Sequence, residues 1–198
     1  MNTLCSVISV VKSFYVALLH FPMRDRKGKV VATALTPIDV PDIARTARTY
    51  GAKRYYVVTP LPSQRAIAER LRDFWVEEED WPTRKEALEL VAIREDLEEC
   101  FREIVQEEGE EPQVWGTTAR EGLPYPRLSW EEARVRLRER PTLILFGTGH
   151  GMTEELLAAC DALLPSIRAR AGYNHLSVRA AVAIILDRLK GENHDRDG

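Results

Sequence analysis

Three alternating glycines follow an apolar stretch of the sequence and form its clearest candidate for a ligand-binding loop. Residues Leu143–Met152 read LILFGTGHGM, in which Gly147, Gly149 and Gly151 come directly after a run typical of a buried strand. Glycines let backbone N–H groups approach a bound molecule with no side chain in the way. The pattern therefore predicts a loop that holds a ligand through its backbone. The alternative is a tight strand-to-helix turn without a ligand.

A dinucleotide-binding loop is the first function that glycines after a strand suggest. That fingerprint normally opens its βαβ unit and needs an acidic residue about 20 positions later. Here the glycines come late, at positions 147–151 of a chain of 198 residues, and position 167 is Ile. An NAD-type oxidoreductase is therefore the weaker interpretation of this loop.

A second group of polar side chains, Asn174, His175 and Ser177, stands directly before a helix rich in small residues. Side chains of these types can orient a bound ligand and accept or pass on a proton. In the structural alternative, Ser177 caps the helix, and Asn174 and His175 form hydrogen bonds within the loop. The sequence leaves both roles open.

Two arginines, Arg45 and Arg48, lie on an early predicted helix within Ile38–Gly51, after the basic loop Arg24–Lys29. A guanidinium stays charged and presents a rigid fork, so it suits the orientation of a phosphate. Most helix arginines, however, are surface residues. The two arginines alone therefore predict little.

The elements around these residues must position them, and short β-branched or aromatic runs alternate here with stretches of helical periodicity. This alternation predicts an α/β fold, with a single domain, a mainly parallel sheet and helices on both faces. The predicted strands are Tyr15–His20, Arg54–Thr59, Leu88–Ile93, Gln113–Gly116, Thr142–Phe146 and Ala162–Pro165. The predicted helices are Pro41–Tyr50, Gln64–Trp75, Glu95–Glu108, Glu131–Glu139 and Ser177–Lys190, with a short helix opened by Thr153 and loops at 24–29, 77–84 and 121–127.

The composition fits one globular domain and limits how it can bind a polyanion. A net charge of −3 over 198 residues excludes binding by bulk positive charge, so such a site must be a local patch. No apolar run reaches the roughly 20 residues of a membrane helix and no secretory signal precedes the first one, so a cytoplasmic protein is expected. The three cysteines lack the spacing of a disulfide framework or a zinc site and are predicted to be core residues.

Residues 1–13 are predicted to be an N-terminal extension and residues 191–198 a disordered polar tail. The acidic run Glu107–Glu111 is predicted to be a solvated helix end.

Taken in order, the three candidate stretches resemble the three motifs of the SPOUT class of RNA methyltransferases. Motif one of its ribose-methylating branch is similar to N-x-G-x-x-x-R-x-x-x-x-x-G, where this chain has Asp39, Pro41, Arg45 and Gly51, so two of these positions differ. Motif two is a strand followed by a glycine loop, and Gly149 stands where many members carry a glutamate.

Motif three of that class is close to S-L-N-V-S-V-A before an alanine-rich helix. It is similar to Tyr173–Arg179, with His175 in place of its asparagine and Ser177 matching its serine. The stretches ALLHFP, DIARTARTYG, YYVVTP, FGTGHGM and YNHLSVRAAVAIILDRL also look like a bacterial family of S-adenosylmethionine (SAM)-dependent RNA methyltransferases whose members are sometimes fused to tRNA guanine-N1 methyltransferase. The resemblance spans most of the chain.

The resemblance implies a C-terminal deep trefoil knot, formed by the segment after about Leu143, that binds SAM and releases S-adenosylhomocysteine. It also implies a homodimer, because family members build the site at a two-fold interface, and a tRNA or rRNA substrate, without membrane or metal. Cofactor contacts are expected from Thr117, Thr118, Phe146, Gly147, Thr148, Gly149, Gly151, Leu164, Ile167, Tyr173, Asn174, His175, Leu176 and Ser177. RNA contacts are expected from Arg24, Arg26, Lys27, Lys29, Arg45, Arg48, Arg168, Arg170 and Arg179.

The implied reaction is ribose 2′-O methylation, favoured over base N-methylation because the motif around Arg45 fits the ribose-methylating pattern better. Arg45 is the catalytic candidate that lowers the pKa of the 2′-hydroxyl or orients its phosphate, while Asn174, His175 and Ser177 order the donor side. The departures at Asp39 and His175 motivate an alternative, a non-catalytic SAM- or nucleotide-binding module that partners another RNA-modification enzyme. The sequence leaves open the target nucleotide and the general base.

Overall fold

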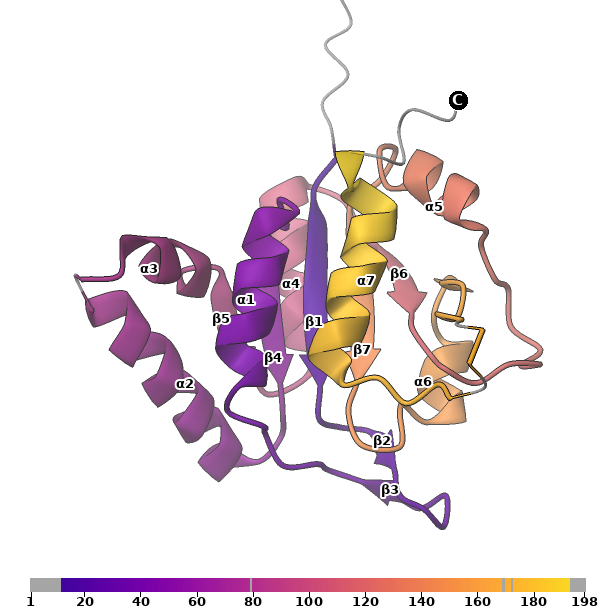
Figure 1. Cartoon of the computed structure of the whole chain (residues 1–198), viewed down its shortest axis with the longest axis horizontal. Coiled ribbons are helices and arrows are strands. Elements are labelled where there is room, and N and C mark those ends of the chain that lie inside the picture. The colour runs from indigo at the N-terminus through magenta and orange to yellow at the C-terminus, as the bar shows by residue number, and fades with distance from the viewer. Residues whose placement is uncertain (1–11, 79, 169, 172, 193–198) are drawn as a thin grey trace, which may run out of the picture.

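The computed structural model of the chain describes residues 12–78, 80–168, 170–171 and 173–192 and shows an α/β fold around a central sheet (Figure 1). Within these residues, six strands run parallel in the spatial order β5-β4-β1-β7-β6-β8. The strands are β1 (Phe14–Leu19), β4 (Arg54–Val58), β5 (Val91–Arg94), β6 (Gln113–Gly116), β7 (Thr142–Gly147) and β8 (Ala162–Leu163). The predicted α/β class with a mainly parallel sheet is confirmed.

Helices cover both faces of this sheet, as expected (Figure 1). One face carries α1 (Asp39–Thr49), α2 (Pro62–Glu77), α3 (Pro82–Leu88), α5 (Trp130–Arg136) and α7 (Val178–Lys190). The other face carries α4 (Leu97–Glu108) and α6 (Glu154–Ala158). A small antiparallel hairpin of β2 (Met23–Arg24) and β3 (Val30–Val31) follows β1.

The central strand β1 is buried along its whole length because helices lie on both of its sides. Successive side chains alternate between the two faces. Val16 and Leu18 belong to the apolar cluster that includes α1 and α7. Tyr15, Ala17 and Leu19 belong to the cluster that includes α4 and α6.

The order of the strands reverses at β1, which pairs on one side with β4 and on the other with β7. In open parallel sheets, ligands bind outside the carboxyl ends of the strands at such a reversal. The last residues of the two central strands, Leu19 and Gly147, are partners in the register. This edge of the sheet is therefore the expected place for a site.

Most predicted elements are present with shifted ends, but the region after α2 was predicted wrongly. Part of the predicted loop 77–84 and the start of the strand predicted at Leu88 form helix α3 instead. Pro82 starts this helix, and Ala87 and Leu88 are buried where it packs on α1. The strand β5 consequently begins only at Val91. The hairpin of β2 and β3, which flanks the basic loop, was also not predicted.

Several local predictions are confirmed. Thr153 caps α6, the short helix predicted to begin there, and Ser129 and Glu132 form a capping box at the start of α5. Cys100 and Cys160 are buried. Cys5, most of the predicted N-terminal extension (residues 1–11) and residues 193–198 of the predicted tail lie outside the described residues.

None of the helices within the described residues is long and apolar enough to cross a membrane. In the same part of the chain, no group of three or more His, Cys, Asp and Glu side chains is arranged to hold a metal ion.

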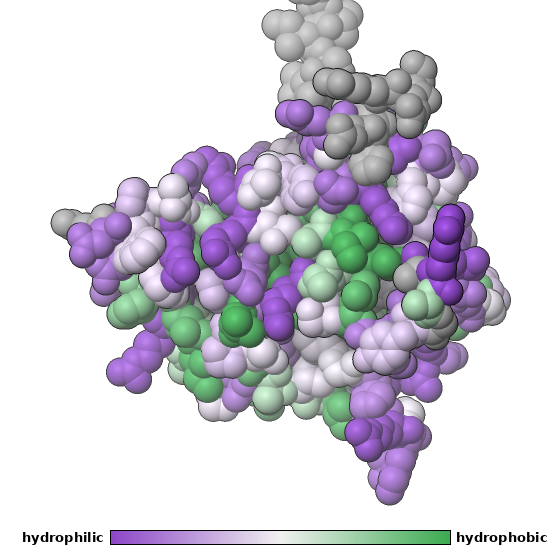
Figure 2. All heavy atoms as spheres, in the orientation of Figure 1, coloured by the Kyte–Doolittle hydropathy of each residue, from purple (hydrophilic) through white to green (hydrophobic). Residues whose placement is uncertain are grey.

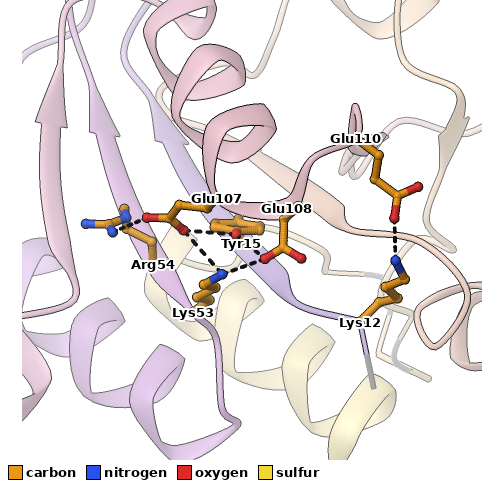
Figure 3. A network of polar contacts seen from close by, with 7 residues as sticks. All are labelled: Lys12, Tyr15, Lys53, Arg54, Glu107, Glu108 and Glu110. Carbon is orange, nitrogen blue, oxygen red and sulfur yellow. Dashed lines mark hydrogen bonds and ion pairs between the residues drawn. The ribbon is translucent and has the colours of Figure 1, made fainter. Parts of the chain in front are cut away.

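The acidic run at the end of α4 was predicted to be a solvated helix end. In the structure, two of its glutamates instead join that helix to the sheet (Figure 3). The buried Tyr15 hydroxyl lies 2.7 Å from Glu108 Oε1 and 3.1 Å from Glu107 Oε2. Lys53 Nζ lies 2.7 Å from Glu108 Oε1, and Arg54 pairs with Glu107. The Glu108 side chain is only 11% exposed. The two glutamates thus join α4 to the amino ends of β1 and β4.

This contact changes the acidity of Glu108. Burial by itself would raise the pKa of the Glu108 carboxyl, but hydrogen bonds from Lys53 and Tyr15 outweigh it and lower the pKa below the ordinary value. A carboxyl group whose pKa is lower in the folded state stabilises the fold above its unfolded pKa, and this contribution disappears as the pH falls through the folded value.

We expect Glu108→Gln to lower the free energy of unfolding by about 1–2 kcal/mol at neutral pH, because the charged hydrogen bonds to Tyr15 and Lys53 are weakened. The difference from the wild type should shrink once the pH falls below the ordinary glutamate pKa of 4.5. Urea unfolding at neutral pH and at about pH 3.5 measures it. The exposed Glu69→Gln on α2 is the control, and an equal loss at both pH values would contradict the assignment.

Candidate active site

A cleft of about 1000 Å³ opens at the carboxyl end of the sheet. Its walls come from segments that are far apart in the sequence. They lie within residues 33–39 up to the start of α1, 117–120 after β6, 146–151 from the end of β7, 165–167 after β8 and 174–185 around the start of α7. The three motif stretches of the sequence all contribute to this cleft. Its position agrees with the reversal of strand order at β1 and β7.

The glycine loop after β7 forms one wall of the cleft. Gly149 has φ +60° and Gly151 has φ +90°, conformations that L side chains rarely adopt. A Cβ atom at Gly147 would lie 2.8 Å from Met152 Cγ, and a Cβ atom at Gly149 would lie 3.0 Å from Thr33 Cγ2. Backbone conformation and close packing therefore both require glycine here, and the loop offers its backbone to the cleft.

Most of the residues expected to contact the cofactor line this one cleft. They are Thr117, Thr118, Phe146, Gly147, Thr148, Gly149, Gly151, Ile167, Asn174, His175, Leu176 and Ser177. The sequence patterns thus selected residues that the fold brings together.

Two expected contact residues, Leu164 and Tyr173, do not line the cleft. The Leu164 side chain is 1% exposed and belongs to the core, because its backbone N–H donates to the Gly116 carbonyl at 2.9 Å and fixes it beside β6. Tyr173 is 73% exposed and packs edge-on against the His175 ring. The side chains of these two residues therefore do not form part of the cleft within a single copy of the chain.

Ser177 has the structural role that the sequence offered as its alternative. Its Oγ accepts a hydrogen bond from the Ala180 N–H at 3.4 Å and caps α7. Ser177 also lines the cleft, so the two roles are compatible.

Arg45, the expected catalytic arginine, lies outside the cleft of its own chain. Its side chain is 50% exposed on α1 and pairs with Asp42. Arg48 is also exposed and pairs with Glu86 of α3. The position of Arg45 at the surface follows from helical spacing, because Ile43, Ala44 and Ala47 occupy the buried face of α1.

The cleft also contains a charged pair that was not selected as part of the site. Asp39 is only 4% exposed, and its Oδ1 lies 3.1 Å from Arg179 Nη1. Burial raises the pKa of the Asp39 carboxyl, and the ion pair with Arg179 partly opposes this shift. Asp39 stood out in the sequence only as a departure from motif one, and Arg179 only as a candidate for RNA contact.

A chain of hydrogen bonds fixes the glycine loop to the segment before α1. His20 Nδ1 lies 3.0 Å from Thr33 Oγ1, which lies 2.5 Å from Thr148 Oγ1. The Thr148 hydroxyl also donates to the Leu19 carbonyl at 2.9 Å, and the Thr33 hydroxyl lies 3.4 Å from the His20 carbonyl, so both threonines are tied to the backbone at the end of β1. Burial lowers the pKa of His20 to about 4, so its ring is neutral at physiological pH.

The cations expected to contact RNA are divided between paired and exposed residues. Arg24 and Arg168 form ion pairs with Glu154 and Glu121. Arg26, Lys27 and Lys29 are exposed at the turn between β2 and β3, which projects as a hydrophilic tip (Figure 2). Three of the residues expected to contact RNA therefore lie on this projecting turn.

Comparison with known proteins identifies the family. The sequence matches the family described as SAM-dependent RNA methyltransferase over residues 13–191. The chain belongs to this family. It is therefore an enzyme that uses SAM as its methyl donor, and the expected class of function is confirmed.

Two relatives of this methyltransferase differ in how much of their length it covers. It is 41% identical over 189 residues to an uncharacterized protein of Aquifex aeolicus, with 94% of this chain and 92% of the other covered. It is 40% identical over 184 residues to a tRNA (guanine-N(1)-)-methyltransferase of Oleidesulfovibrio alaskensis, with 91% of this chain covered. It spans only 43% of that second relative.

Solved structures of methyltransferases share the fold. A probable methyltransferase from Bordetella pertussis aligns with a TM-score of 0.61 and 20% identity, covering 91% of this chain and 95% of the other. The SpoU methyltransferase AviRb from Streptomyces viridochromogenes, solved with its cofactor AdoMet, aligns with a TM-score of 0.57 and 16% identity, covering 92% and 58%. The fold of this methyltransferase is thus the one found in SpoU enzymes.

We expect Gly149→Val to abolish SAM binding by the methyltransferase, because the branched side chain enters the cleft wall and crowds Thr33. Isothermal titration calorimetry with SAM measures this. Gly122→Val is the matched control, since Gly122 has a similar φ of +69° but an added Cβ would meet nothing within 4 Å. Unchanged affinity in a folded Gly149→Val protein would place the donor elsewhere.

Proposed function

We propose that this methyltransferase transfers a methyl group to a ribose 2′-hydroxyl of tRNA or rRNA, in the cleft at the carboxyl end of the sheet. The observation that carries the proposal is the meeting of all three motif stretches in that cleft. Bound SAM supplies a methyl group on a sulfonium. The protein has to hold that methyl group about 3 Å from the acceptor oxygen and assist the loss of its proton.

The residues of the cleft suit a donor of this kind. The glycine loop offers backbone next to small side chains, and Thr117 and Thr118 lie after the neighbouring strand β6. In this proposal Asn174, His175 and Ser177 order the donor. Leu164 contributes through the position of its backbone and Tyr173 by supporting the His175 ring.

We further propose that Arg45 acts on the cleft of a second copy of the chain, since it lies outside the cleft of its own copy. Helices α1 and α7 are joined by a hydrogen bond from the Tyr50 hydroxyl to Asp187 Oδ1 at 3.0 Å. Hydrophobic side chains gather over α7 on the face toward the viewer (Figure 2). The small residues Ala180 and Ala183 of this helix permit the close approach that a two-fold interface needs.

The proposal includes a deep trefoil knot after about Leu143 within a single domain, as the resemblance implies. It is supported by the common cleft of the loop after β7 and the stretch after β8, which lie side by side although α6 separates them in the sequence. A cytoplasmic location is proposed with the RNA substrate.

Methylation of a base nitrogen is the second candidate. It is favoured by the name of the Oleidesulfovibrio relative, a tRNA (guanine-N(1)-)-methyltransferase, although this chain spans 43% of that protein. A non-catalytic SAM-binding partner of another RNA-modification enzyme remains the rival from a different class. Asp39 and His175 motivate it because they replace motif asparagines.

The methylated product distinguishes these functions. RNA from a strain that lacks the gene is incubated with the protein and methyl-labelled SAM, and its nucleosides are identified by mass spectrometry. We expect a 2′-O-methylated nucleoside, which also yields alkali-resistant dinucleotides. A base-methylated nucleoside would establish the second candidate, and SAM binding without transfer to any RNA would establish the binding module.

Arg45→Ala is expected to leave SAM affinity nearly unchanged and to lower methyl transfer by about two or more orders of magnitude, the scale of a lost positioned charge. Arg45→Lys should recover little, because an ammonium lacks the planar fork. Arg102→Ala, an exposed arginine of α4 on the other face of the sheet, is the control.

Mixed dimers test whether Arg45 acts between copies. Equal amounts of Arg45→Ala and Gly149→Val chains, allowed to exchange, should recover about a quarter of the wild-type activity, because half of the dimers are mixed and each has one intact site. No recovery despite mixed dimers, or a monomer by light scattering, would contradict the arrangement.

A further inference from the structure

The pair of Asp39 and Arg179 joins the first helix to the last one inside the cleft. Asp39 is the first residue of α1, and Arg179 lies in the first turn of α7, 140 residues later in the sequence. Both side chains line the cleft. A charged pair in this position faces whatever molecule enters beside the donor.

Only one of the two oxygens of the Asp39 carboxylate has a hydrogen-bond partner among the described residues. Arg179 Nη1 contacts Oδ1 at 3.1 Å, and its Nε lies 3.8 Å from Asp42 Oδ2, so one guanidinium serves two carboxylates. Among the described residues, no hydrogen bond reaches Asp39 Oδ2. Asp39 Oδ2 is not among the fully buried side-chain atoms that lack a partner, and Asp39 lines the cleft, so this oxygen is open to the cleft and suited to accept a proton or hydrogen bond from a ligand.

Within the cleft, Asp39 lies apart from the donor wall, which consists of the glycine loop and residues 174–177. That wall offers backbone and side chains without a carboxylate. Asp39, the first residue of α1, follows Thr33 and Thr36 on a separate wall. The only carboxylate of the described lining residues thus lies on that wall rather than on the glycine loop.

We propose that Asp39 is a catalytic residue that accepts the proton of the RNA hydroxyl being methylated, and that Arg179 is a positioning residue that orients its carboxylate. The inference rests on the proposed function of the cleft. In the step, the hydroxyl O–H bond breaks and its proton passes to Asp39 as the new O–C bond forms. The sulfonium S–C bond breaks, its electron pair stays on sulfur, and Asp39 later returns the proton to solvent.

The electrostatic environment supports this role. Burial raises the pKa of Asp39, and a carboxylate with a raised pKa is a stronger base. The groups that face it are Arg179 from α7, Asp42 from α1 and the buried Tyr55 from β4.

The test is single-turnover methyl transfer by the intact protein at saturating SAM and RNA. Asp39→Asn keeps the shape and the acceptor for Arg179, and it should lower the rate by about 10²- to 10⁴-fold while SAM affinity stays within about twofold. The wild-type rate should rise with pH through an acid limb that Asp39→Asn lacks and Asp42→Asn retains. Asp73→Asn, an exposed aspartate of α2, is the charge-matched control and should transfer at the wild-type rate.

Arg179 provides a second, independent readout. Arg179→Ala should move the acid limb to higher pH, because the guanidinium that stabilises the Asp39 carboxylate is lost, and Arg179→Lys should move it back in part. The shift of the acid limb in the Arg179 variants tests the role of Asp39 even if the Asp39→Asn protein does not fold.

An Asp39→Asn protein that transfers methyl groups at the wild-type rate, or that keeps the acid limb, would overturn the inference. Failure of the proposed function gives a different result, because the wild-type protein would then bind no SAM or would yield no 2′-O-methylated product. The two outcomes are therefore distinguishable in the same assays.

Discussion

Burial of the central strands on both faces is the constraint that decides where this molecule can do chemistry. All six residues of β1 are buried, and its neighbour β7 is buried up to Phe146. An unpaired polar group inside such a sheet would lose its hydration without compensation, so polar side chains collect at the ends of the strands. At the amino end they pair around Tyr15, and at the carboxyl end they line the cleft.

The two ends use charge for different purposes. At the amino end, Glu107 and Glu108 face Lys53 and Arg54, and the tyrosine hydroxyl completes the network, so the protein itself supplies the partners of both carboxylates. In the cleft, only one oxygen of Asp39 has a hydrogen-bond partner among the described residues. The other oxygen is not among the buried atoms that lack a partner, so it is open to the cleft.

The glycine loop and the segment before α1 are joined by direct side-chain contacts. Thr33 contacts Thr148 of the glycine loop at 2.5 Å, and an added Cβ at Gly149 would meet the same threonine at 3.0 Å. The buried, neutral His20 ring contacts the same Thr33 hydroxyl through its Nδ1 atom. In the proposed function, one connected unit would thus hold both donor and acceptor, as an in-line transfer over a short distance requires.

The sequence by itself determined the α/β class and the parallel sheet, because apolar periodicity and glycines after a strand act over a few neighbouring positions. Most of the cleft residues were expected from the resemblance to the SPOUT class, and the fold brings the three motif stretches together. Local patterns missed α3, because its helix is held by the burial of Ala87 and Leu88 where α3 packs on α1. They also misjudged the acidic end of α4, because only the fold brings Tyr15 within hydrogen-bond distance of Glu108. The tertiary structure alone decided that Asp39 meets Arg179, since packing of α1 beside α7 joins residues separated by 140 positions.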